Sequence, residues 1–256
     1  KVRYIGKSGV SLTRNKILEK DEAAKLSPWR METGQRYGQQ FGLVAIGLFK
    51  DEEDISTSPR QTFGEVRPGD VKYLDINGDG IIDIEDRKPI GYSNIPEIIY
   101  GFGAQFDYKG FDIGLFFRGQ ANVTYSLGGS TFVPFIEGVG KHNLYTKALD
   151  RWSVENPNPN AFYPRLDNGR NSNNWQLSTR TIYDGSLLRL SDIELGYTLK
   201  KNITLPLHIN SARIYTIATN MGLWSKWDMW DPETGSSNGS EYPLTRKINI
   251  GIKLTF

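Results

Sequence analysis

The chain has 256 residues, and its 31 Lys and Arg residues nearly balance 29 Asp and Glu residues, for a net charge of +2. Because the two signs are interspersed, there is no sustained basic surface for a nucleic-acid backbone, and nucleic-acid binding is excluded. The absence of cysteine excludes disulfides, thiolate metal sites and cysteine nucleophiles. A glycine count of 27 with 12% aromatic residues predicts a β-rich chain with many turns.

The first half of the chain carries weak strand patterns. Apolar and polar side chains alternate loosely over residues 2–13 and again over residues 37–49, which is the period of a β-strand. The segment 15–36 between them is too long for a tight turn, and we expect part of it to extend the flanking strands. No apolar run in the chain approaches the roughly 18 residues that a membrane-spanning helix needs.

Clearer strands follow. Residues 100–108 and 111–117 each place apolar side chains on one face, and Lys109-Gly110 between them predicts a hairpin. Residues 188–199 alternate with a change of phase near Ser191, which predicts a β-bulge there. A weaker strand is expected over 212–223, and the clearest alternation runs over 247–256. About seven strands are expected, so the fold is all-β with antiparallel strands.

The alternation is compatible with two kinds of sheet. A half-solvated sheet of a soluble protein is the ordinary meaning of such a pattern, and a transmembrane barrel with an apolar outer wall is the other. The predicted connections are short near 109–110 and 200–210 but long over about 50–98, 127–185 and 224–245. Compact soluble domains rarely carry three such loops, whereas outer-membrane barrels join short turns at one end to long extracellular loops at the other. The connections therefore favour part of a barrel.

The first long loop contains a calcium-binding pattern. Residues 75–86 place oxygen-bearing side chains at positions 1, 3, 5 and 9, a glycine at position 6 and a carboxylate at position 12. Hard oxygen ligands suit Ca²⁺. We expect a structural Ca²⁺ ion whose ligands are Asp75, Asn77, Asp79, the Ile81 carbonyl, Asp83 and Asp86. Nearby Pro68 and Pro89 argue against long flanking helices, so a sensor-type switch is not expected; a metal-free turn is the alternative.

The sequence shows no pattern of a catalytic site. His142 and His208 are the only histidines and lie far apart, and no nucleophile elbow, phosphate-binding loop or triad spacing occurs. Carboxylate pairs such as Asp192 with Glu194 are better explained as charges on a wet strand face. The chain is therefore not expected to be an enzyme.

Aromatic residues gather in the last two long loops, with amides and carboxylates between them. Flat aromatic faces in such surroundings are typical of a sugar-binding surface, although rings that simply pack the loops together are an equal alternative for each residue. The expected substrate or partner surface consists of Trp152, Trp175, Trp224, Trp227, Trp230 and Tyr242.

Several short motifs together resemble one family. In chain order they include Gly47-Leu-Phe, Pro68-Gly-Asp, the run from Tyr73 to Gly80, Asp86-Arg, Ile90-Gly, Tyr100-Gly-Phe, Arg151-Trp, Tyr163-Pro-Arg-Leu, Leu188-Arg-Leu, Leu195-Gly-Tyr, Asp231-Pro-Glu and the alternating terminal strand ending in Phe256. This set is similar to the C-terminal half of SusC-like (SusC/RagA family) TonB-dependent outer-membrane transporters of Bacteroidetes. Lys201-Asn202 stands where the family usually has a proline.

The resemblance implies a 22-stranded transmembrane barrel with an N-terminal plug, which imports oligosaccharides or peptides with energy from the TonB complex under a SusD-like lipoprotein. Since 22 strands of about 10 residues would consume roughly 220 residues, the chain is expected to be a C-terminal segment without a plug domain. The remainder of the barrel is then a necessary partner, because open sheet edges are not tolerated in lipid. Phe256 also resembles the terminal assembly signal of outer-membrane proteins.

Two other interpretations stay open. One is a soluble, calcium-stabilised β-sheet module that binds glycans. The other is a small closed barrel of about eight strands that acts as a pore or adhesin. A multi-pass outer-membrane location follows from the favoured interpretation.

Overall fold

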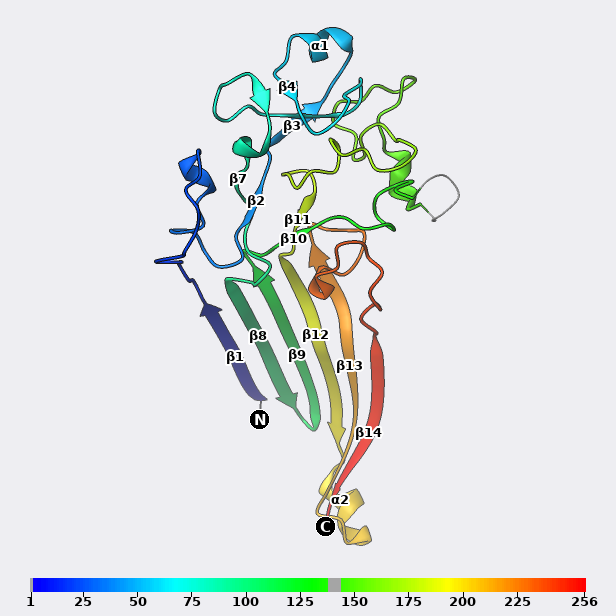
Figure 1. The fold of residues 1–256 in the computed structure, drawn as a ribbon. Helices are drawn as coiled ribbons and strands as arrows, with labels where there is room; N and C mark the ends of the chain where they lie inside the picture. The colour runs from blue at the N-terminus through cyan, green and yellow to red at the C-terminus, as the bar shows by residue number, and fades with distance from the viewer. Residues whose placement is uncertain (1, 138–143) are drawn as a thin grey trace.

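A computed structural model describes residues 2–137 and 144–256. Its largest element is a six-stranded antiparallel sheet with the strand order β1-β8-β9-β12-β13-β14 (Figure 1). The strands are β1 (Val2–Leu12), β8 (Ile98–Tyr108), β9 (Phe111–Ala121), β12 (Leu187–Thr198), β13 (Ser211–Ser225) and β14 (Lys247–Thr255). Every neighbouring pair is antiparallel, and the predicted all-β, antiparallel class is confirmed.

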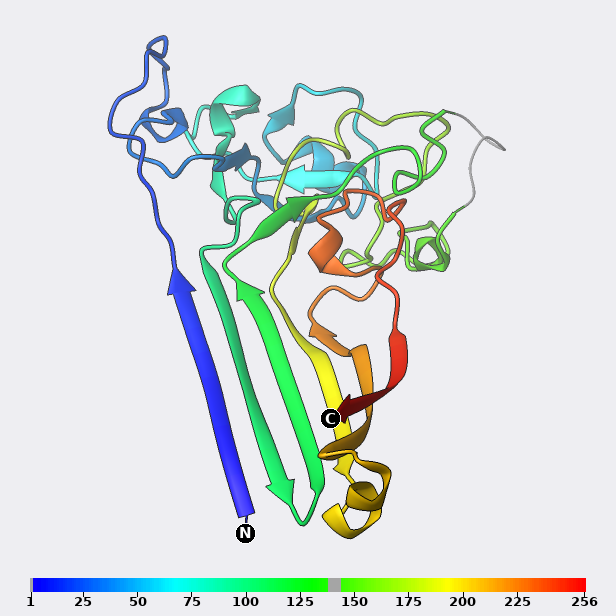
Figure 2. The ribbon, with the colours of Figure 1, turned by 90° about the horizontal axis from the view of Figure 1, so that it is seen from below.

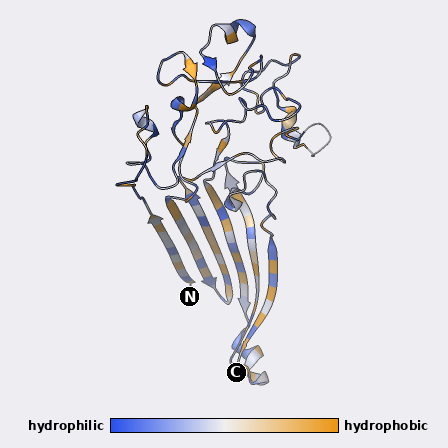
Figure 3. Ribbon diagram, in the orientation of Figure 1, coloured by the Kyte–Doolittle hydropathy of each residue, from blue (hydrophilic) through white to orange (hydrophobic). Residues whose placement is uncertain are grey.

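The sheet has two chemically different faces, because side chains alternate along each strand. One, the apolar face, carries residues that pair across the strands, such as Phe106 with Ile113 and Thr216 with Ile250. The opposite, polar face carries Asp112, Glu194 and Arg213, which form an ion-paired cluster. The alternating bands of hydropathy are visible along the strands in Figure 3. Ile250 is 81% exposed and Ile252 66% exposed, so most of the apolar face is left open by the residues that the structure describes.

The details of the hairpin and the bulge agree with the sequence. Lys109 and Gly110 both have positive φ, at 50° and 93°, which is the backbone of the two-residue turns that match strand twist. The pairing of β12 with both of its neighbours shifts register between Leu190 and Asp192. The predicted hairpin and the predicted bulge near Ser191 are therefore confirmed.

The prediction of a sheet strand over residues 37–49 is wrong, and the sheet has six strands rather than about seven. This segment forms only β2 (Gln40–Gly42) and β3 (Ala45–Leu48), outside the large sheet. A Cβ on Gly42 would lie 2.6 Å from the Leu177 carbonyl oxygen, so this backbone packs against another loop. Gly47 has a φ of 140°, which L side chains rarely adopt. The segments 15–36 and 50–98 consequently belong to one long connection, 13–97.

The connections alternate in length along the whole chain. Segments 13–97, 122–186 and 226–246 are long, and all lie at the same end of the sheet, the loop end (Figures 1 and 2). The connections at the opposite end, the turn end, are 109–110 and 199–210. Among the described residues, no helix is long and apolar enough to cross a membrane.

The connections carry only short elements. In the loops these are η1 (Pro28–Arg30), β2, β3, α1 (Glu52–Ser56), β4 (Arg60–Gln61), β5 (Val71–Tyr73), β6 (Ile81–Ile82), η2 (Ile84–Asp86), β7 (Lys88–Ile90), β10 (Thr124–Ser126), η3 (Thr146–Leu149), β11 (Ile182–Asp184) and η5 (Pro232–Thr234). At the turn end they are α2 (Lys201–Thr204) and η4 (Leu205–Leu207). The buried cores of the molecule lie in the loops rather than between layers of sheet.

Candidate functional site

The long connections fold together into a loop layer above the sheet. One buried core joins the first two loops and contains Leu43, Leu48, Val71, Tyr73, Ile82, Trp152 and Ala161. A second core contains Leu127, Phe132, Val133, Ala148, Tyr163 and Tyr183, with aromatic side chains of the third loop packed against it. The described parts of the loops therefore pack around buried cores of their own at the loop end.

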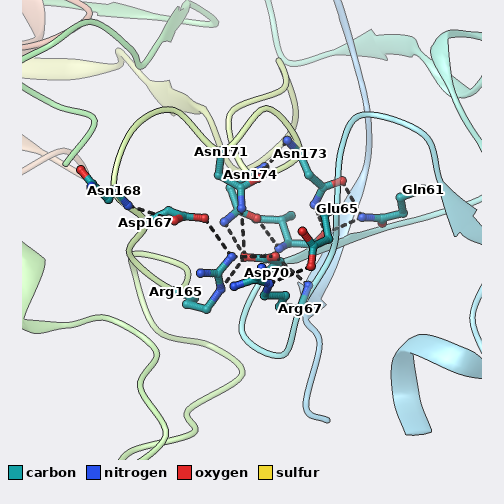
Figure 4. A network of polar contacts seen from close by, with 11 residues as sticks. Gln61, Glu65, Arg67, Asp70, Arg165, Asp167, Asn168, Asn171, Asn173 and Asn174 are labelled. Carbon is teal, nitrogen blue, oxygen red and sulfur yellow. Dashed lines mark hydrogen bonds and ion pairs between the residues drawn. The ribbon is translucent and has the colours of Figure 1, made fainter. Parts of the chain in front are cut away.

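The polar centre of the loop layer is Asp70, whose side chain is completely buried (Figure 4). Its carboxylate accepts hydrogen bonds from Arg165 Nε at 3.2 Å and from Asn174 Nδ2 at 2.8 Å, both in the second loop. Asn171 and the Arg67 amide donate to it as well. Because a buried carboxylate is tolerated only when it is paired and hydrogen-bonded, Asp70 ties loop 13–97 to loop 122–186.

The same contact region continues through buried amides. Gln61 Nε2 donates to Asn173 Oδ1 at 2.7 Å, and Asn173 Nδ2 donates to the Val71 carbonyl at 3.0 Å. The Tyr73 hydroxyl donates to the Asn173 carbonyl, and burial raises the pKa of Tyr73. This network was not predicted from the sequence. Its two central residues could have been singled out, because Asp70 and Arg165 both lie in motifs that resemble the family, Pro68-Gly-Asp and Tyr163-Pro-Arg.

The third loop is fixed to the polar face of the sheet. Arg189 of β12 is only 3% exposed and contacts Asp231 at 2.6 Å and Glu233 at 2.8 Å. Arg118 of β9 also donates to Glu233, at 3.1 Å. The Asp231-Pro-Glu motif therefore places two carboxylates against two arginines of the strands, and this turns loop 226–246 toward the polar side.

The expected aromatic surface separates into three environments. Trp152 is 6% exposed and packs in the first core against Gly69, where a Cβ would lie 2.2 Å from the indole ring. This placement differs from the expected surface position. Trp175, Trp227 and Trp230 pack against the second core, where Trp227 stacks on Tyr183 with ring centroids 4.3 Å apart. Burial in this cluster raises the pKa of Tyr183 to about 12.

The two remaining aromatic residues of that set are exposed. Trp224 is 53% exposed on the apolar face, with its ring 6.3 Å from that of Phe117. Tyr242 is 82% exposed in loop 226–246. Only Tyr242 thus combines exposure with a position in the loop layer, whereas Trp224 lies where the sheet meets the loops.

The predicted calcium loop is held by its own backbone amides. Asp75 accepts from Gly78 and Gly80, at 2.6 and 2.9 Å, and Asp79 accepts from Ile81. Asp86 is completely buried and accepts from the amides of Ile76 and Asp83. Asn77 and Asp83 likewise accept from amides within the loop. The loop is bordered by β5 and β7 rather than by long helices, as the prolines indicated.

Calcium binding itself stays a prediction. Within residues 2–137 and 144–256, no three His, Asp or Glu side chains are grouped so that they could hold a metal ion. The donor set matches Ca²⁺ in kind, since it consists of carboxylates, an amide and a carbonyl. His208 lies at the turn end in a left-handed conformation with a φ of 57°, and His142 lies outside the described residues.

Known proteins with similar sequences are TonB-dependent receptors, in agreement with the motifs. The chain is 29% identical over 96% of its length to TonB-dependent receptor P26 of Formosa agariphila and 28% identical over 88% to TonB-dependent receptor P3 of that organism. It spans 26% and 23% of those two proteins, about a quarter of their length. No protein-family model matches the chain.

Solved structures agree in fold. The whole chain superimposes on 27% of a chain in the RagAB peptide importer, with a TM-score of 0.72 and 18% identity in its open-open state. In the closed-closed state the TM-score is 0.73 with 19% identity. The sequence relatives are receptors rather than enzymes, which agrees with the prediction that this chain is not an enzyme. The expected resemblance is confirmed: the chain is similar in sequence to TonB-dependent receptors and has the fold of the corresponding part of a chain in the RagAB importer.

Proposed function

We propose that the protein to which this chain belongs imports nutrients across the outer membrane with energy from the TonB complex. The observation that carries this proposal is the architecture of the sheet. One face is mostly apolar and largely exposed, the other carries charged side chains, and the long connections lie at one end. A barrel wall needs this arrangement, because its outer surface meets lipid and its inner surface meets water.

The remainder of the barrel has to pair with both edges of the sheet. In the described chain β1 and β14 each have one neighbouring strand, and unpaired backbone amides are too costly in hydrocarbon. The loop end would then face outside the cell. There a SusD-like lipoprotein would cover the loop layer, as the pairing in the RagAB importer suggests.

The substrate class is an oligosaccharide or a peptide. RagAB is described as a peptide importer, and the loops of this chain present Tyr242 together with amide and carboxylate side chains. Uptake of labelled oligosaccharides and labelled peptides, compared between cells with and without the receptor, separates the two classes. Receptor-dependent uptake of neither would contradict the importer function.

The first test is the size and location of the native protein. An antibody against residues 247–256 should detect a heat-modifiable band in the outer-membrane fraction, several-fold larger than the chain's own 29.0 kDa. Heat modifiability reports a folded barrel that resists detergent until boiling. A soluble band near 29.0 kDa would contradict the proposal and favour a calcium-stabilised glycan-binding module instead.

A further inference from the structure

Three lysines gather at the turn end of the sheet. Lys109 lies in the β8–β9 turn, and Lys200 and Lys201 lie in the connection from β12 to β13; all three are exposed. The two turns are joined, because the Thr198 amide donates to the Gly110 carbonyl at 2.7 Å. Asp107 and Asp112, the nearby carboxylates, belong to the polar face, where Asp112 pairs with Arg213. The lysines therefore form a basic cluster at the turn end of the central strands.

Directly beside this cluster the apolar face is hollowed. The groove has a volume of about 680 Å³ and is lined mostly by apolar and aromatic side chains of β8, β9, β12, β13 and β14, with Asp112 and Thr216 also in the lining. Aromatic rings form its border at the turn end. Phe111 and Tyr197 lie with ring centroids 4.4 Å apart, and the Lys109 ammonium lies 5.1 Å from the centre of the Tyr108 ring. An apolar groove thus ends at aromatic rings and then at positive charge.

The connection 199–210 extends this surface beyond the strands. α2 contacts β13, and Ala212 on the apolar face is buried although its neighbours on that face, Ile214 and Leu254, are exposed. The turn therefore folds toward the apolar side. Ile203 and Leu205 within it are about half exposed, at 51% and 55%, so the apolar surface continues up to the lysines.

We infer that the groove and the basic cluster together bind one anionic phospholipid of the leaflet at the turn end. Its acyl chain would lie in the groove, and its phosphate would contact Lys109, Lys200 and Lys201. The mostly apolar lining suits an acyl chain better than a water-soluble anion, and lysines at a membrane surface attract anionic headgroups. Aromatic side chains are favoured at this depth, where one end of the ring meets hydrocarbon and the other meets water. The inference rests on the proposed outer-membrane location.

The test uses the full-length receptor, purified in mixed micelles of phosphatidylglycerol and phosphatidylcholine and analysed by native mass spectrometry. The triple variant Lys109→Asn, Lys200→Gln, Lys201→Gln removes the charges; asparagine is chosen because it tolerates the left-handed conformation at position 109. Retained phosphatidylglycerol, relative to phosphatidylcholine, should fall by about a hundredfold, as expected for three lost charges at a membrane surface. Arginine at positions 200 and 201 should keep the retention.

The matched control removes three exposed lysines of the loop layer, by Lys16→Gln, Lys50→Gln and Lys226→Gln, and should leave the ratio unchanged. Equal losses in both triple variants, or equal retention of the two lipids by the natural sequence, would overturn the inference. Heat modifiability of the same samples separates the two proposals. A barrel that is folded in the outer membrane but does not discriminate between the lipids refutes the lipid site alone.

Discussion

Asp70 is the residue on which the order of the loop layer depends most. A carboxylate with no exposed surface loses its hydration on folding, and it recovers that energy only through donors that surround it. Arg165, Asn171 and Asn174 provide those donors from a loop that is about 100 residues away in sequence. Asp167 also contacts Arg165, at 3.0 Å, but is 41% exposed. The two carboxylates therefore allow a matched comparison.

Asp70→Asn should loosen the contact between the first two loops. The variant leaves the Arg165 guanidinium without its buried carboxylate. It also places an amide NH2 group against donors that the carboxylate accepted from, so the contact between the loops should lose about 3 kcal/mol of stability. Protease cleavage of loop 122–186 in the membrane-inserted receptor should rise by about a hundredfold where local opening limits cleavage. Asp167→Asn should change it little, because exposed pairs contribute little. Equal cleavage of both variants would contradict this role for Asp70.

Glu22 makes the first loop sensitive to acid. Its carboxylate accepts hydrogen bonds from the Thr33 amide and hydroxyl and from the Glu32 amide, which lower its pKa from 4.5 to about 2. Because the folded pKa is depressed, the stabilisation is complete above pH 4.5 and is lost as the pH falls toward 2. Hydrogen exchange of the Glu32 and Thr33 amides should accelerate across that range relative to their intrinsic rates. Glu22→Gln should remove the pH dependence of this exchange. A Glu22 carboxyl that titrates near 4.5 in the folded protein would refute the prediction.

At the scale of elements, the loop 75–86 is held both by hydrogen bonds within the motif and by contacts with neighbouring segments. Side-chain oxygens of Asp75 and Asp79 hold the turn through amides, and the parallel pairing of β4 with β6 joins the loop to residues 60–61. Glu85 pairs with Arg30 of η1, and Trp29 donates to the Glu85 carbonyl at 3.2 Å. The loop is thus anchored at both sides, and a bound ion would stiffen its exposed tip.

Replacing Asp75 and Asp79 by Ala should raise the protease sensitivity of residues 50–98 several-fold in the presence of Ca²⁺, while insertion into the membrane is kept. The physical reason is the loss of two hard oxygen ligands from one site. The control Glu52→Ala, Glu53→Ala changes two exposed acids of the same connection and should have no such effect. Cleavage of the natural sequence that is the same with Ca²⁺ and with a chelator would contradict the calcium assignment.

At the scale of the whole molecule, Phe256 tests whether the terminal strand carries an assembly signal. It follows β14, is 79% exposed and continues the phase of Leu254 on the apolar face. Phe256→Ala should lower the amount of inserted, heat-modifiable receptor several-fold, and Phe256→Tyr should retain it. Phe111→Ala removes a comparably exposed ring of the same face and should have a smaller effect. Unchanged assembly of Phe256→Ala would contradict the signal.

The sheet was predictable because its information is local. Alternation along 100–108, 111–117 and 247–256 identifies strands with one apolar face, and Lys109-Gly110 identifies the hairpin. Even the bulge near Ser191 is visible as a change of phase in the sequence. The segment 37–49 misled the prediction for the same reason: its local alternation resembles that of a strand, but close contacts at Gly42 and the backbone of Gly47 direct it into the loop layer.

The sequence by itself therefore determined the fold class, the two faces of the sheet and the resemblance to TonB-dependent receptors, since each depends on residue order over short ranges. Tertiary structure alone decided which polar residues meet. Asp70 with Asn174 and Arg189 with Asp231 are joined across 104 and 42 positions, and no periodicity encodes such pairs. It also decided that Trp152 lies in a core while Tyr242 is exposed, because burial of a ring in a loop depends on packing between distant segments rather than on its neighbours in sequence.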